Sequence, residues 1–141
     1  MLIGEYKHNL DPKKRLAVPA KLRKDLGERA VLTRGLDNCL FLYPAVEFQK
    51  LTERLAQLPT GKSDIRSLVR SLLAGATEVE LDGLGRILIP DYLKQYAGIK
   101  QDVVIIGISD LIEIWAKEKW NEFYESNRGS FEELADKLIS E

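Results

Sequence analysis

Hydrophobic and polar positions change their spacing several times along the chain, and each spacing predicts a short element. Four segments near the N-terminus either alternate or are short and apolar, which is typical of strands. Residues 20–26 instead carry helical spacing, with Pro19 before the segment and Gly27 after it. The expected order is strand, strand, short helix, strand, strand, with the strands at residues 5–10, 15–18, 30–34 and 40–43.

Two longer amphipathic segments follow. Residues 45–58 have apolar side chains along one face of a helix and polar side chains along the rest. A loop at residues 60–62 separates this helix from a second one, for which Ser63 is the predicted N-cap and Gly75 the terminator. We therefore expect two consecutive helices in the middle of the chain.

The first scheme then recurs in the second half of the chain. Strands are predicted at residues 77–81, 87–89, 103–106 and 111–115, and a short helix at 91–97. A helix at residues 117–126 follows, and Ser130 with Glu133 has the spacing of a capping box for a last helix that runs through Ile139.

The recurrence is also visible in the residues themselves. Residues 11–27 and 82–98 align without a gap and share five identities, where average composition gives roughly one by chance. An internal repeat indicates a duplicated unit, so we expect two similar halves packed together. The identical pairs are Asp11 and Asp82, Arg15 and Arg86, Pro19 and Pro90, Leu22 and Leu93, and Gly27 and Gly98.

Composition narrows the class of protein. The 141 residues are 45% hydrophobic and 30% charged, which is ordinary for a globular protein. No apolar stretch approaches the ~20 residues that a membrane-spanning helix needs. The single Cys39 excludes an internal disulfide, and a reducing cytoplasm is the expected location.

The net charge of −1 conceals an uneven distribution. Residues 1–24 contain seven basic side chains and two acidic ones, a net charge of +5, whereas residues 110–141 contain four basic and nine acidic ones. A basic segment on a nearly neutral protein attracts polyanions locally. A solvated polar face is the alternative interpretation, and the charge cluster alone does not choose between them.

The residue patterns that indicate catalytic or metal sites fit this sequence poorly. Gly61-Lys62-Ser63 resembles the end of a phosphate-binding loop, but Ala56 stands where that loop needs a glycine. One histidine, His8, and one cysteine, Cys39, cannot build a His/Cys metal site or a nucleophile–histidine set within one chain. We therefore predict a protein that is not an enzyme and that needs no cofactor, metal or small-molecule substrate.

The duplicated Asp-x-x-x-Arg segments carry the clearest chemistry. A tight turn between paired strands would place its Asp and Arg close enough to hydrogen-bond, and locking the turn is the favoured role for Asp11 and Asp82. Lys13, Lys14 and Arg15 are adjacent cations that repel one another, so they point to an anionic ligand. Lysines suit phosphates, and an arginine fork suits guanine. In the second copy only Arg86 is charged.

The doubled Asp-x-x-x-Arg-(three apolar residues)-Pro unit resembles the MraZ family of bacterial transcription regulators, and each half is similar to a SpoVT/AbrB-type domain. The resemblance implies an α+β fold of two tandem swapped-hairpin AbrB-like β-barrel halves that form a pseudo-dimer, with connecting and C-terminal helices. The first repeat with its trailing helix is expected at residues 1–59, the linking helix at 60–76 and the second repeat with the C-terminal helices at 77–141.

The resemblance also implies a function. Family members assemble into ring-like homo-oligomers and bind short direct repeats of double-stranded DNA in the promoter of the division and cell-wall gene cluster, usually as repressors. A cytoplasmic, nucleoid-associated protein without a membrane partner is therefore expected. An oligomeric assembly module or an antitoxin-like protein-interaction module on the same fold is the alternative, although such antitoxins usually carry one repeat and a disordered tail.

Residues are carried over by position in the motif. The DNA-binding candidates are Lys13, Lys14, Arg15 and Arg86, followed by Arg23 and Lys24, and the structural motif residues are Asp11, Asp82, Pro19 and Pro90. The family commonly has glycine where this chain has Lys14. Lysine disfavours the positive φ that glycine permits, so we expect the first turn to differ in shape from the second.

Overall fold

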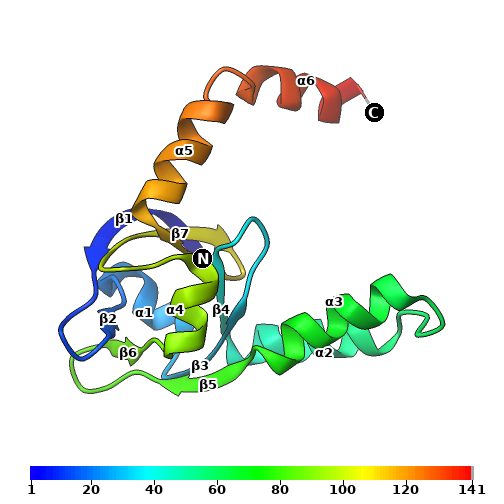
Figure 1. Ribbon diagram of the computed structural model, residues 1–141. Helices are drawn as coiled ribbons and strands as arrows, with labels where there is room; N and C mark the ends of the chain where they lie inside the picture. The colour runs from blue at the N-terminus through cyan, green and yellow to red at the C-terminus, as the bar shows by residue number, and fades with distance from the viewer. Residues whose placement is uncertain (141) are drawn as a thin grey trace.

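The computed structural model describes residues 1–140 and has a mixed α+β architecture (Figure 1). The first half contains β1 (Leu2–Asn9), β2 (Arg15–Ala17), α1 (Ala20–Leu26), β3 (Arg29–Arg34), β4 (Leu40–Pro44) and α2 (Ala45–Ala56). The second half contains α3 (Ser63–Ala74), β5 (Thr77–Glu80), β6 (Arg86–Leu88), α4 (Asp91–Ala97), β7 (Asp102–Ser109), β8 (Ile112–Ala116), α5 (Lys117–Asn127) and α6 (Phe131–Ser140). The predicted order of elements is confirmed in both halves.

Two strands, β1 and β7, extend three residues beyond their predicted bounds at one end. β1 and β7 pair antiparallel along their full lengths, from Leu2 opposite Ser109 to Asn9 opposite Asp102. The sequence pattern of either strand alone could not reveal this ladder, because the two partners come from different halves of the chain. Gly4 and Gly107 face each other within it.

One predicted cap is wrong. Ser63 is the first residue of α3, Lys62 takes the N-cap position, and no side-chain hydrogen bond caps this helix. The capping box predicted at Ser130 differs too: Ser130 precedes α6, but its hydroxyl and its backbone N–H both donate to the Asn127 carbonyl, at 2.8 and 3.0 Å, instead of forming the reciprocal bonds with Glu133.

The strands of the two halves are interleaved. One sheet has the order β1-β7-β8-β4-β3-β5, so β7 of the second half lies beside β1 of the first, and β5 lies beside β3. β2 and β6 form a separate two-stranded ribbon. Among the described strands no ladder joins the outer strands β1 and β5, so the predicted barrel is not closed by hydrogen bonds. Because the halves exchange strands, they nevertheless form a single body.

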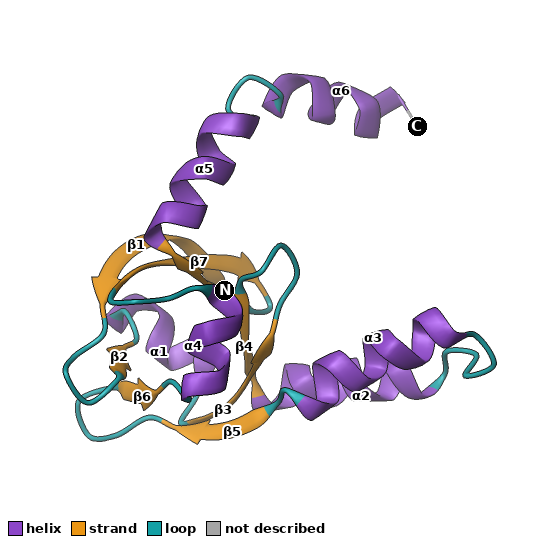
Figure 2. Cartoon of the chain, in the orientation of Figure 1, coloured by secondary structure: helices purple, strands orange, loops and turns teal. Residues whose placement is uncertain are grey.

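The main core is assembled from both repeats. Leu22 of α1 and Leu93 of α4 hold aligned positions in the two copies, and both are almost completely buried. In Figure 2 the strands surround these two helices. Burial of such leucines contributes roughly 1.5–3 kcal/mol each, which explains why the repeat retains them.

A second cluster lies beside the first and is aromatic. Phe41, Tyr43 and Trp115 are buried in it together with Cys39, and side chains of α2 and α5 pack against them. Burial raises the pKa of the Cys39 thiol, which keeps it protonated and unreactive.

Two helical arms project from this body in Figure 1: the α2–α3 hairpin on one side and the α5–α6 pair on another. No helix in the described part of the chain is both long and apolar enough to cross a membrane.

Candidate nucleic-acid interface

The two Asp-x-x-x-Arg turns lie side by side at one end of the molecule, where the chain enters β2 and β6 (Figure 1). β2 and β6 pair antiparallel, with Leu16 opposite Ile87 at the centre. Both of these side chains are buried, which attaches the ribbon to the core beneath it. The pairing therefore brings together two turns that are far apart in the sequence.

The first turn is closed by the Asp11 carboxylate. Its Oδ1 accepts hydrogen bonds from the backbone N–H groups of Lys13 and Arg15, both at 2.9 Å. Its Oδ2 accepts one from Arg15 Nε at 2.8 Å. The backbone N–H of Lys14 donates to the Asp11 carbonyl at 2.9 Å. Backbone and side chain thus fix the arginine relative to the turn.

The second turn repeats this network. Asp82 Oδ1 accepts from the backbone N–H groups of Leu84 and Arg86, and Oδ2 accepts from Arg86 Nε, each at 2.9 Å. The backbone hydrogen bond donated by each arginine holds the pKa of its aspartate below the ordinary value, and the guanidinium adds to this effect. Both aspartates therefore stay ionised beside their arginines.

The expectation that the first turn differs in shape is wrong. Lys14 has φ +63°, close to the +74° of Gly85 at the matching position, and the backbone hydrogen bonds correspond one to one. The bonds to the Asp11 carboxylate hold the backbone of the turn on one side of Lys14. The Lys14 carbonyl is held on the other side, since it accepts from Ile89 N at 3.0 Å. Lysine therefore adopts the left-handed conformation despite its intrinsic preference.

Reciprocal contacts join the two turns. The Lys14 carbonyl accepts from Ile89 N, and the Gly85 carbonyl accepts from Val18 N at 2.9 Å. Arg86 Nη1 also lies 3.7 Å from Asp11 Oδ2, so this aspartate contacts both arginines. The bonds through Nε leave the terminal nitrogens of each guanidinium as donors for a ligand. The structure therefore presents two oriented arginine forks on one edge.

The lysines around this edge have different surroundings. Lys14 Nζ lies 2.6 Å from Asp91 Oδ1, so part of its charge is neutralised by the first residue of α4. Lys13 is exposed at the tip of the turn. Lys24 is exposed in the last turn of α1, one residue and about 100° around the helix from Arg23.

Arg23 contacts the second turn and therefore forms part of the same edge. Its Nε donates to the Val18 carbonyl at 2.8 Å, and its guanidinium covers Gly85. A Cβ at position 85 would lie 2.3 Å from Arg23 Cζ, so only glycine leaves room for this packing. The structure thus gathers Lys14, Arg15, Arg23 and Arg86 around the two turns.

Pro19 and Pro90 occupy the N-cap positions of α1 and α4. Their carbonyls accept hydrogen bonds from Leu22 N at 2.9 Å and Leu93 N at 3.1 Å, which starts each helix directly after its strand.

Sequence reasoning missed Asp91. An acidic residue follows Pro90, whereas Ala20 follows Pro19, but the ion pair with Lys14 joins opposite halves of the chain, and no local pattern reports it.

Within residues 1–140 no group of three or more His, Cys, Asp or Glu side chains is placed to hold a metal ion. The edge offers cationic hydrogen-bond donors on a rigid backbone, which is suited to binding an extended anion.

Two repeats that share a core and place paired arginine turns on one edge define a tandem-repeat α+β protein with a basic edge. A family model described as "MraZ protein, putative antitoxin-like" matches residues 1–71 and again residues 72–141. The chain belongs to the MraZ family.

Curated relatives align with this chain over nearly their whole length. The chain is 50% identical over 139 residues to "Transcriptional regulator MraZ" of Natranaerobius thermophilus, covering 99% of this chain and 97% of the relative. It is 54% identical over 138 residues to the protein of the same name from Clostridium beijerinckii, covering 98% and 96%. The protein of that name from Caldanaerobacter subterraneus is 51% identical, with the same coverage. The resemblance to this family of transcriptional regulators is confirmed.

Proposed function

We propose that the protein regulates transcription by binding promoter DNA through the edge formed by the two Asp-x-x-x-Arg turns. The observation that supports this most directly is the juxtaposition of Arg15 and Arg86. Each is held through Nε by its own aspartate, and reciprocal backbone bonds couple the two turns. A guanidinium oriented in this way can donate two parallel hydrogen bonds to guanine O6 and N7 without first losing much side-chain freedom.

The side chains around the arginines then supply affinity that does not depend on sequence. Lys13, Arg23 and Lys24 neutralise phosphates, and each neutralised phosphate releases counterions. Lys14 shares its charge with Asp91, so it contributes less than its position suggests. Base recognition is assigned to Arg15, with Arg86 beside it.

Each chain has one such edge, and one edge binds weakly. A ring-like homo-oligomer would present several edges to direct repeats spaced about one helical turn apart, and simultaneous engagement raises the affinity. Occupied promoter DNA excludes the transcription machinery, so the proposed role is repression of the division and cell-wall gene cluster without a cofactor or effector. The proposed location is the cytoplasm, on the nucleoid.

Fluorescence anisotropy tests this proposal. A ~30 bp duplex from upstream of the protein's own gene and a scrambled duplex are titrated over a series of salt concentrations. The native duplex is expected to bind more tightly, with log affinity falling linearly as log salt rises. Equal and weak binding to both duplexes would refute sequence-specific regulation and favour an assembly or protein-interaction role.

Lys13→Ala separates phosphate contacts from base contacts. It should weaken binding to both duplexes alike and reduce the salt slope by about one, because one phosphate contact is lost. A loss confined to the native duplex would contradict the assignment of Lys13 to the phosphates.

A further inference from the structure

The last helix, α6, has an apolar face that no part of the described chain covers. Phe131, Leu134, Leu138 and Ile139 are 77%, 53%, 77% and 84% exposed. Their spacing of three, four and one residues places them along one stripe of the helix, and charged residues, most of them acidic, lie on the rest of it. A stripe of this size on an extended arm marks a contact surface.

An apolar groove of matching character runs along the other arm, between α2 and α3. Leu55, Ile65, Val69 and Leu73 line it, and its volume is about 280 Å³. Leu73, near the end of α3 at the base of the hairpin, is substantially exposed. The groove and the α6 stripe are thus two open apolar surfaces on one molecule.

The groove is held in place at both ends. At its base, Thr33 Oγ1 donates to the Leu72 carbonyl at 2.6 Å, and Arg34 Nη1 donates to the Ser71 carbonyl at 3.1 Å. At its tip, Arg66 Nη1 donates to the Thr60 carbonyl at 2.7 Å. Because these bonds tie α3 to β3 and to the hairpin loop, the groove needs little ordering before it binds.

The charges of the two surfaces are opposite. Arg66 and Arg70 border the groove. Around its apolar stripe, α6 carries the acidic residues Glu132, Glu133 and Asp136 and the basic residue Lys137, so its polar side is negative on balance. Complementary potentials of this kind favour the pairing of the two surfaces over the pairing of either surface with itself.

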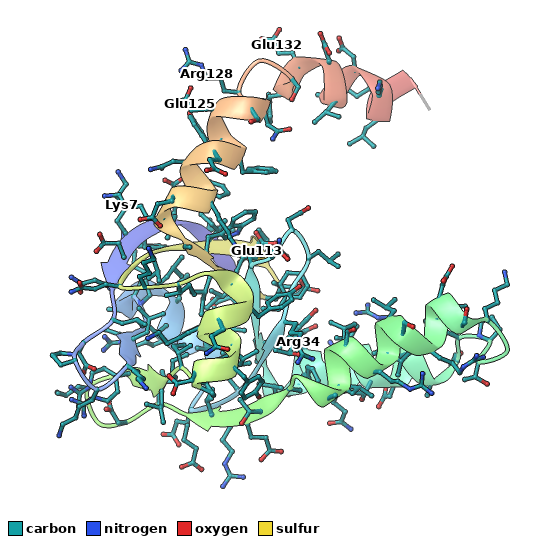
Figure 3. The ribbon with its side chains drawn as sticks, viewed as in Figure 1. Lys7, Arg34, Glu113, Glu125, Arg128 and Glu132 are labelled. Atoms are coloured by element: carbon teal, nitrogen blue, oxygen red, sulfur yellow. The ribbon has the colours of Figure 1, made fainter. Side chains whose placement is uncertain are left out.

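A chain does not fill its own groove. Trp115 and Trp120 meet edge to face with ring centroids 5.4 Å apart, and Phe123 stacks on Trp120 and also contacts Trp115, which holds α5 on the sheet. Figure 1 shows that α5 carries α6 away from the body and clear of the α2–α3 hairpin. In Figure 3 the side chains of α6, Glu132 among them, stand clear of the rest of the molecule.

We propose that α6 of one subunit docks into the α2–α3 groove of a second copy, head to tail. The contact joins two different surfaces, so each subunit offers one α6 and one groove, and repetition produces a closed ring or an open chain. The inference rests on the homo-oligomer in the proposed function and names the surfaces that build it.

Complementary variants test the contact. Leu134→Glu/Leu138→Glu alters only exposed positions of α6, and Val69→Glu alters the groove. Analytical ultracentrifugation is expected to show that each variant alone needs a protein concentration about 30-fold or more above that of the unaltered protein to assemble. Mixed together, they should form a one-to-one dimer that grows no further, since one intact α6 meets one intact groove.

Val46→Glu is the matched control, because Val46 is exposed on α2 but does not line the groove. It should assemble as the unaltered protein does. Crosslinking provides a second measurement: Leu138→Cys mixed with Leu73→Cys should yield a disulfide-linked dimer under mild oxidation, while buried Cys39 stays inert.

Full assembly of the Val69→Glu variant, or an unaltered protein that is monomeric at all concentrations, would overturn the docking contact. DNA binding is read separately, by anisotropy on a duplex with one repeat. Dissociated variants that keep weak, salt-dependent binding would uphold both proposals. Normal assembly through α6 without DNA binding would refute the regulatory function alone.

Discussion

The two Asp-x-x-x-Arg turns have one shape and two chemistries. Both use an aspartate to bind two backbone N–H groups and an arginine Nε, and both place a residue in the left-handed conformation. The first turn fills that position with Lys14, and the second leaves it to Gly85, over which Arg23 lies. The Asp–Arg pair therefore sets the geometry of each turn, and the intervening residues are free to set its charge.

The largest expected effect comes from removing the arginines one at a time. Arg15→Ala should cost roughly 1–3 kcal/mol per engaged site and relax the preference for the native duplex, because a base contact is lost. Arg86→Ala should cost less, since no lysine accompanies it in the second turn. Anisotropy on native and scrambled duplexes measures both. Equal losses would show that the two turns contact DNA in the same way.

Exchanging the left-handed residues tests the shape of the turns. Gly85→Lys should lower the free energy of unfolding by about 1–2 kcal/mol for the left-handed backbone, and it also displaces the Arg23 guanidinium. Lys14→Gly should leave stability unchanged or raise it by up to about 1 kcal/mol while weakening DNA binding. Urea unfolding measures stability, and Lys13→Gly, at a position with ordinary φ, is the control.

Asp91 controls how much positive charge the first turn presents. Asp91→Asn releases Lys14 Nζ to bind a phosphate, so affinity should rise a few-fold and the salt slope should steepen by about one. Asp64→Asn, which also removes an acid from the first turn of a helix, is the matched control. An unchanged salt slope in Asp91→Asn would show that Lys14 does not approach the DNA.

The smallest effect is a dependence on pH. Hydrogen bonds from the backbone N–H groups of Arg15 and Arg86 hold the pKa values of Asp11 and Asp82 below their ordinary 3.8. A pKa that is lower in the folded state contributes stability that is present above the unfolded value and is lost as the pH falls through the folded one.

Urea unfolding between pH 7 and pH 3 tests this linkage. These two carboxylates should add no pH dependence above about pH 5, and their contribution should decline below about pH 4. Asp11→Asn/Asp82→Asn should therefore lose less stability than the unaltered protein between pH 5 and pH 3. Equal losses of stability in the variant and the unaltered protein would show that Asp11 and Asp82 do not contribute to the acid dependence.

The sequence predicted the features that depend on neighbouring residues. Apolar spacing located α1 and α4, and the repeated aspartate and arginine located the turns, because each depends on residues within one short segment. The full length of β1 and the Lys14–Asp91 ion pair escaped prediction, since each needs a partner from the opposite half. The left-handed conformation of Lys14 was not predicted for a related reason: hydrogen bonds from the surrounding turn outweigh the intrinsic preference of lysine.

The interleaved sheet has a consequence for the synthesis of the chain. β1 is among the first segments to leave the ribosome, but it must wait for β7, and β3 must wait for β5. Until then the first repeat exposes unpaired strand edges and core leucines, the features that chaperones bind and that drive aggregation. A message truncated before β7 would therefore yield an aggregating fragment rather than a functional single-repeat protein.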